Sequence, residues 1–214
     1  MCCASIWLLT NSGSRARKEV LSELIERKRH GSLKVYLGYA AGVGKTYAML
    51  QEGLRLKQQH VDVVIGYLEP HDRPETMALA EHLETVPPRE WRVGDAVFHE
   101  MDVEAILARK PQVVLVDELA HTNADGSKND KRYSDVLEVL AQGINVISTI
   151  NVQHLESVAA RVEEATGIAV RERIPDTVLR RADQVVNVDV TKEELRERLR
   201  QGKIYAPQQA ERAL

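Results

Sequence analysis

The 214-residue sequence predicts an α/β fold: a three-layer sandwich with a mostly parallel sheet of five or more strands between two layers of helices. Apolar segments rich in β-branched residues alternate along the chain with segments of helical periodicity. The strand segments are continuous apolar runs, which indicates that both faces of each strand are covered. The formal charge of −3 is nearly balanced, so no global field favours nucleic acid as a partner.

Two regions are expected, an N-terminal tail with a basic amphipathic helix at 1–30 and one domain at 31–214. In 14–30 one stripe holds the apolar residues Val20, Leu21, Leu24 and Ile25, and basic residues crowd both ends. Docking to a partner or to lipid headgroups stays open for this helix. A solvated helix that packs by one face is the preferred interpretation, because its basic residues are not confined to one face.

The first half of the domain predicts two strand–helix pairs and an irregular stretch. "LKVYLGY" at 33–39 and "VDVVIGYLE" at 61–69 are apolar and rich in strand-forming residues. Helical spacing follows each of them, at 45–59 and at 74–84. The stretch 86–100 contains two prolines and a glycine, and it is expected to be irregular with at most a short strand.

The second half continues the alternation. The expected elements are helix 102–110, strand 111–119, helix 131–143, strand 144–152, helix 154–167, strand 182–190 and helix 191–202. Asp102 is expected to cap the first of these helices, and Gly143, Gly167 and Gly202 to close the other three. No apolar stretch reaches the roughly 20 residues that span a bilayer, so a cytoplasmic placement is expected.

The stretch "GYAAGVGKTYAML" at 38–50 predicts a phosphate-binding loop. It follows a buried strand and opens a helix, and Gly42 and Gly44 would let backbone N–H groups converge on phosphate oxygens. Lys45 would reach the β- and γ-phosphates, and the Thr46 hydroxyl would bind Mg²⁺. The predicted cofactors are therefore ATP and Mg²⁺; a glycine-rich turn with an incidental lysine is the alternative.

The loop departs from the usual spacing G-x-x-x-x-G-K-[ST]. Counting back from Gly44 places Tyr39 where the first glycine is expected, and Gly38 comes one residue early. Gly38 and Val43 are still assigned to the nucleotide-binding loop. Tyr39 is expected to contact either the base or a neighbouring loop.

A second buried strand supplies carboxylates. "VVLVDE" places Asp117 at the end of a strand, where phosphoryl-transfer folds hold a second ligand for Mg²⁺. Glu118 follows directly, in the position of a general base that would polarise an attacking water. A strand-end aspartate that caps the next element and a solvent-facing glutamate are the alternatives.

Further polar residues follow the expected strands, where parallel sheets bind ligands. Asn151 is assigned to the γ-phosphate; the other candidates, each also compatible with a turn or cap role, are Glu69, His71, Arg73, His121, Thr122, Asn123, Thr149, Gln153 and His154. The loop 121–132 is the main polar loop of the chain. Its basic residues Lys128, Lys131 and Arg132 would either support a transition state or remain solvated.

Several longer stretches resemble the amino-terminal domain of the KdpD family, the potassium-responsive sensor histidine kinases of bacteria. The resemblance is carried by "GVGKTYAML", "DELAHTN", "GSKNDKRYSDVLEVLAQGINV", "NVQHLES" and "QGKIYAPQQAERAL". An early glycine such as Gly38 is similar to the "GAAPGVGKT"-like loops of that family, whereas Tyr39 replaces the small residue usual there. The resemblance covers most of the chain.

The resemblance implies a cytoplasmic ATP-binding regulatory domain of a sensor kinase that controls potassium-uptake genes. Its implied partners are ATP and the stress-protein-like, membrane and kinase-core domains of a protein anchored in the bacterial inner membrane; a homodimer is a further candidate. The chain shows no kinase-core nucleotide boxes, so at most slow ATP hydrolysis is expected of it. A free-standing ATPase with Glu118 as catalytic base is the alternative, and a small-molecule kinase is a weaker one.

Overall fold

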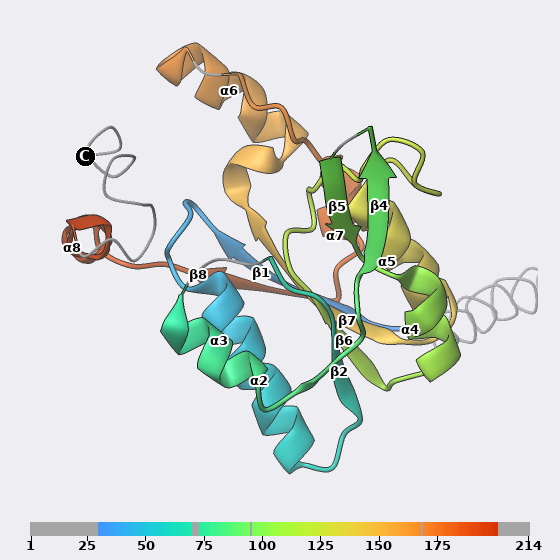
Figure 1. The fold of residues 1–214 in the computed structure, drawn as a ribbon. Helices are drawn as coiled ribbons and strands as arrows, with labels where there is room; N and C mark the ends of the chain where they lie inside the picture. The colour runs from blue at the N-terminus through green and yellow to red at the C-terminus, as the bar shows by residue number, and fades with distance from the viewer. Residues whose placement is uncertain (1–29, 70–72, 95, 168, 201–214) are drawn as a thin grey trace, which may run out of the picture.

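The computed structural model describes residues 30–69, 73–94, 96–167 and 169–200, so the tail and helix expected at 1–30 lie almost wholly outside the described residues. Within this part of the chain a six-stranded sheet forms the centre of the fold (Figure 1). All of its strand pairs are parallel. In spatial order its strands are β3 (Glu84–Thr85), β2 (Val63–Tyr67), β6 (Val113–Val116), β7 (Asn145–Asn151), β1 (Leu33–Gly38) and β8 (Gln184–Val188).

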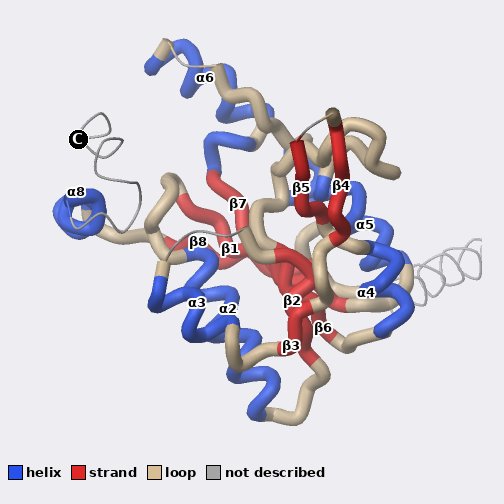
Figure 2. The backbone as a smooth tube through the Cα atoms, in the orientation of Figure 1, coloured by secondary structure: helices blue, strands red, loops and turns tan. Residues whose placement is uncertain are grey.

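Helices cover both faces of the sheet, which confirms the predicted three-layer sandwich (Figures 1 and 2). Helices α2 (Lys45–Gln58) and α3 (Pro74–Ala80) lie on one face, where Met49 and Leu50 are buried against apolar strand residues. Helices α4 (Val103–Arg109) and α5 (Arg132–Ala141) lie on the other face with Ile106, Val136 and Val139 in a second core cluster. The continuous apolar strands thus have the two buried faces that their composition predicted.

The stretch expected to be irregular forms a β-hairpin instead. Strands β4 (Arg89–Val93) and β5 (Ala96–Glu100) pair antiparallel as a separate two-stranded sheet. Gly94 adopts φ 60° at the turn, a conformation that glycine reaches without strain. Most of β5 is solvent-exposed, and only Glu100 at its end is buried, so the apolar signal that marks a core strand is missing.

The C-terminal part adds elements that the sequence patterns did not separate. A 3₁₀ turn η1 (Val152–His154) precedes α6 (Glu156–Thr166), and α7 (Asp176–Arg180) and α8 (Lys192–Arg200) flank β8. The predicted helix caps are present at the helix ends that the structure describes. The Asp102 carboxylate accepts from the Ala105 N–H at 2.9 Å, and Gly143 and Gly167 take positive φ after α5 and α6. Gly202 lies outside the described residues.

The strand order places β7 between β1 and β6. In register, Gly38 pairs with Asn151 and Val116 pairs with Ser148. The loops that follow β1 and β6 are therefore separated by the carboxyl end of β7. Within the described ranges, none of the helices combines the length and apolar character that crossing a membrane requires.

Candidate functional site

The loop between β1 and α2, residues 38–46 and here called the glycine loop, depends on its glycines. Gly42 and Gly44 adopt φ 83° and 105°, in the left-handed region that side chains disfavour. A Cβ at Gly38 would stand 2.6 Å from Val43 Cγ2 and 2.9 Å from Lys45 Cδ. The early glycine therefore leaves room for the Lys45 side chain to pass over the end of β1, which accounts for its displaced position in the sequence.

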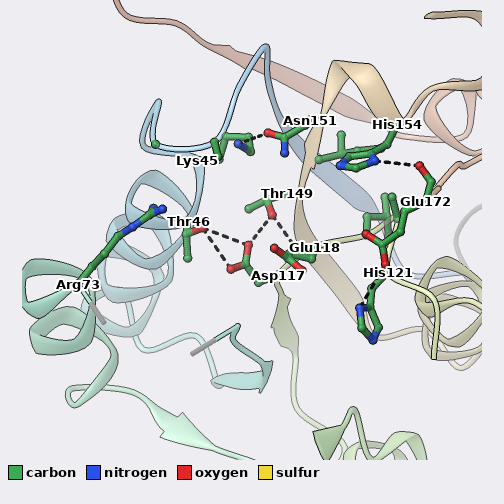
Figure 3. A pocket seen from close by; sticks show the side chains of 15 residues that line it. Lys45, Thr46, Arg73, Asp117, Glu118, His121, Thr149, Asn151, His154 and Glu172 are labelled. Atoms are coloured by element: carbon green, nitrogen blue, oxygen red, sulfur yellow. Dashed lines mark hydrogen bonds and ion pairs between the residues drawn. The ribbon is translucent and has the colours of Figure 1, made fainter. Parts of the chain in front are cut away.

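Lys45 points into the concave side of the glycine loop. Its ammonium donates to the Ala40 carbonyl at 3.0 Å and to Asn151 Oδ1 at 2.5 Å, so the predicted lysine at the start of α2 meets the predicted amide at the end of β7 (Figure 3). Burial of the side chain lowers the pKa of Lys45 to about 8, although the carboxylates of Asp117 and Glu118 act in the opposite direction. A desolvated cation whose hydrogen bonds go to the neutral oxygens of Ala40 and Asn151 gains from a bound anion.

Thr46 and Asp117, the two predicted metal ligands, lie against each other. The Thr46 hydroxyl is 3.2 Å from both Asp117 carboxylate oxygens, and the Thr149 hydroxyl donates to Asp117 Oδ1. Asp117 is only 1% exposed. No cluster of three or more His, Cys, Asp or Glu side chains suited to a metal occurs among the described residues. A hydroxyl and a carboxylate fit Mg²⁺, which takes few protein ligands and completes its shell with water and substrate phosphates.

Glu118 departs from ordinary backbone geometry. Its φ of 54° lies in the left-handed region, and its N–H donates to the Thr149 hydroxyl at 3.1 Å. A non-glycine residue in that region costs about 1–2 kcal/mol, and such strain concentrates at functional sites. Its side chain lines the same pocket as Asp117 and Lys45.

The wall opposite the glycine loop is formed by His121, His154 and Glu172 (Figure 3). His154 Nδ1 lies 2.9 Å from the Glu172 carbonyl oxygen, and His121 Nδ1 lies 3.6 Å from its carboxylate. Sequence reasoning missed Glu172, because it follows no strand and stands in no recognisable motif. Its neighbour Ile174 is fully buried and forms a bridge with Leu155, and that contact carries Glu172 to the site.

The basic residues of the loop 121–132 do not reach this pocket as free cations. Arg132 is fully buried, where its guanidinium lies 3.6 Å from the Tyr67 ring and 3.3 Å from a Glu100 oxygen. It also donates to the Asp117 carbonyl at 3.3 Å, which ties it to the strand end behind the pocket. Lys128 pairs with Glu138, and Lys131 donates to the Thr122 hydroxyl.

The loop 121–132 is held against α5 by the side-chain amides of two asparagines. Asn123 and Asn129 each donate to the Asp135 carboxylate at 2.7 Å, and the Asn123 side chain also donates to the Asn129 carbonyl. Burial raises the pKa of Asp135, although these two amides act against the rise. These hydrogen bonds hold the loop 121–132 in one position beside the pocket.

The structure brings most of the predicted residues together. One pocket is lined by Gly42, Lys45, Thr46, Arg73, Asp117, Glu118, His121, Thr149, Asn151 and His154. Val43 and Gly44 line a second hollow, and Gly38 lies next to the Val43 and Lys45 side chains. Tyr39 donates to the Val190 carbonyl at 3.0 Å, so it contacts a neighbouring loop. Glu69, Thr122, Asn123 and Gln153 do not line the pocket, and His71 lies outside the described residues.

Comparison with known proteins points to one family. The model of a family described as KdpD, osmosensitive K⁺ channel His kinase sensor domain, matches residues 29–214. A putative sensor protein KdpD of Synechocystis is 55% identical over 186 residues, which is 87% of this chain and 50% of that protein. Sensor protein KdpD of Mycobacterium tuberculosis is 54% identical over 87% of this chain, and that of Escherichia coli 45% over 96%.

The chain spans only 22% and 23% of the length of the latter two relatives. Among solved structures, the flagellar accessory protein FlaH of Methanocaldococcus jannaschii is similar with a TM-score of 0.35 and 16% identity. That similarity covers 64% of this chain and 69% of FlaH.

Proposed function

The chain belongs to the KdpD family of osmosensitive K⁺ channel His kinase sensor domains, and we propose that it is a cytoplasmic, ATP-binding regulatory domain of a potassium-responsive sensor kinase. One observation carries the proposal. Thr46, beside Lys45 at the start of α2, and Asp117, at the end of β6, are 71 positions apart and meet within 3.2 Å. Lys45, Thr46 and Asp117 line one pocket, as a site for a nucleotide and its metal requires.

Each residue has a distinct task in this proposal. Thr46 and Asp117 would hold Mg²⁺, which when bound supplies positive charge that offsets the charge of the phosphates. Backbone N–H groups of Gly42 and Gly44 would contact phosphate oxygens at the start of α2, where the helix dipole favours anions. Lys45 would exchange its contact with Asn151 for a phosphate oxygen, leaving the Asn151 amide beside the γ-phosphate.

Regulation would act through the loops that follow β6 and β7. Glu118 follows β6 and donates its N–H to the hydroxyl of Thr149 near the end of β7, so an anion beside Asp117 changes the charge that both face. A bound ligand that prefers one arrangement of these loops shifts the population toward it. The rest of the sensor kinase is the proposed recipient of that shift, since the relatives that this chain matches are named sensor proteins.

Replacing Lys45 with alanine tests the proposal. The unmodified protein should bind Mg-ATP, and Lys45→Ala should weaken binding about 10- to 100-fold, because charge-assisted hydrogen bonds contribute about 1.5–3 kcal/mol each. Isothermal titration calorimetry measures both. Lys128→Ala removes the same charge from an exposed side chain and should bind ATP normally. Absence of ATP binding by the unmodified protein, or equal binding by Lys45→Ala, would refute the proposal.

Proton uptake should accompany ATP binding above pH 8. Because burial lowers the pKa of Lys45 to about 8, much of the free protein has a neutral Lys45 at pH 8.5. A bound polyphosphate favours the protonated form and raises this pKa, so affinity should fall as the pH rises through 8. Titration at pH 8.5 in two buffers of different ionisation enthalpy should show uptake of about half a proton or more. The uptake should approach zero at pH 7, and proton release at pH 8.5 would contradict the assignment.

The strained backbone of Glu118 favours a second candidate function, slow ATP hydrolysis. Its carboxylate lines the pocket next to the predicted metal ligands, where a general base must stand to take a proton from water. Occupancy and turnover are separable, and a regulatory domain can use either of them as its signal.

A further inference from the structure

A second hollow lies on the other side of the glycine loop. It is lined by Gly42, Val43, Gly44 and Tyr47, by Arg73, Glu75 and Thr76 at the start of α3, and by Glu194, Glu197 and Arg198 of α8. Gly42 and Arg73 also line the first pocket, so the two hollows adjoin each other at the loop. The second encloses about 1150 Å³ and the first about 510 Å³, both including space open to solvent.

Helix α8 is hydrogen-bonded to the glycine loop beside this hollow. Arg198 Nη1 donates to the Gly42 carbonyl at 2.8 Å, and Arg198 Nη2 donates to the Glu194 carboxylate at 2.5 Å. Tyr39 donates from the same loop to the Val190 carbonyl, just before α8. Helix α8 therefore forms a wall of the hollow and is bonded to the glycine loop.

The proposed direction of the nucleotide leads into this hollow. Lys45, Asp117 and Asn151 gather in the first pocket, which fixes the β- and γ-phosphates at that end. The rest of the ligand must leave along the start of α2, where Tyr47 follows Thr46. Tyr47 lines this hollow and is 38% exposed, so its aromatic ring is available for a base to stack on.

The charge of the second hollow suits a neutral group. Three carboxylates, those of Glu75, Glu194 and Glu197, line it with two guanidinium groups, those of Arg73 and Arg198. The excess of one negative charge disfavours a polyphosphate, whereas the carboxylates can accept hydrogen bonds from sugar hydroxyls. We propose that this hollow is the nucleoside subsite, in which the base stacks on Tyr47 and α8, held by Arg198, closes the far side. The inference rests on the proposed function.

In this arrangement, α8 contacts the nucleoside part of the ligand. Phosphates alone would contact the glycine loop and leave α8 untouched, whereas a nucleoside triphosphate would also contact α8, the helix that follows β8. The structure thus assigns two separable parts of one ligand to two parts of the fold.

The test compares Mg-ATP with Mg-tripolyphosphate, which lacks the nucleoside, by calorimetry. The unmodified protein should bind ATP about tenfold or more tightly than tripolyphosphate, because stacking of a base on an aromatic residue is worth about that factor. Tyr47→Ala should lose that advantage and bind tripolyphosphate as before, while Tyr47→Phe should retain it. Tyr47 is partly exposed, and circular dichroism verifies that each variant is folded.

Arg198→Ala should also lower ATP affinity, about three- to tenfold for one lost polar anchor, without changing tripolyphosphate affinity. Arg196→Ala, on an exposed position of the same helix, is the matched control and should bind both ligands normally. If Tyr47→Ala and Arg198→Ala change both ligands equally or neither, the subsite is wrong while the proposed function stands. If neither ligand binds the unmodified protein, the proposed function fails and the subsite fails with it.

Discussion

Arg132→Met should lower the free energy of unfolding by about 3–5 kcal/mol, the cost of leaving one partner of a buried ion pair alone. Arg132 is fully buried between Glu100 and the Tyr67 ring. Burial alone would raise the pKa of the Glu100 carboxyl, but hydrogen bonds from His121 and the Ala124 N–H, with the charge of Arg132, hold it below its usual value. Methionine fills similar space but leaves that carboxylate with less compensation. Urea unfolding followed by circular dichroism measures the loss.

Two further variants isolate the cause. Lys128→Met removes a cation from an exposed pair with Glu138 and should cost less than about 1 kcal/mol. Adding Glu100→Gln to Arg132→Met removes the stranded charge and should recover part of the stability. If the free energy of unfolding of Arg132→Met lies within 1 kcal/mol of that of the unmodified protein, then the buried pair contributes little to stability. Packing alone would then support the end of β6.

Glu118→Gln should reduce ATP turnover about 10²- to 10⁴-fold, the usual contribution of a general base, with Mg-ATP affinity changed less than threefold. Glutamine has almost the same shape but cannot take a proton from water at this position. Both residues have the same backbone preference, so the strain at φ 54° is preserved and only the chemistry changes. Phosphate release measures turnover, and calorimetry measures affinity.

The matched control is Glu104→Gln, which alters an exposed glutamate on α4 whose side chain is 73% accessible. It should change neither quantity. Turnover that persists in Glu118→Gln would show that another group activates water. If the unmodified protein binds ATP without turnover, the hydrolytic candidate is discarded and the regulatory proposal stands alone.

The sequence predicted the sheet well because its buried strands carry a dense signal. Uninterrupted apolar runs such as 113–116 and 63–65 admit few alternatives to a doubly covered parallel sheet. The hairpin at 89–100 was missed because its strands are mostly exposed, and exposed pairs need no apolar run. The short helix α7 was missed for a related reason, since five residues leave too little periodicity to detect.

The site was predictable where a residue stands directly at a strand end or in the glycine loop. Lys45, Thr46, Asp117 and Asn151 come together as their positions implied. Their partnerships were not predictable, because they depend on strand order. Only the insertion of β7 between β1 and β6 puts Asn151 against Lys45 and Thr149 against Asp117. The fate of Arg132 was also hidden, since a basic residue in a polar loop gives no sign that it will be buried.

The position of β1 in the sheet has a consequence for folding during synthesis. Both neighbours of β1, strands β7 and β8, come more than 100 residues later in the chain. The apolar segment "LKVYLG" is thus made early, and its hydrogen-bonding edges stay unpaired until nearly the whole domain has been translated. Such long-range parallel pairing slows folding, and the folding intermediates expose apolar surface that promotes aggregation. The domain should therefore depend on holdase chaperones while it is on the ribosome.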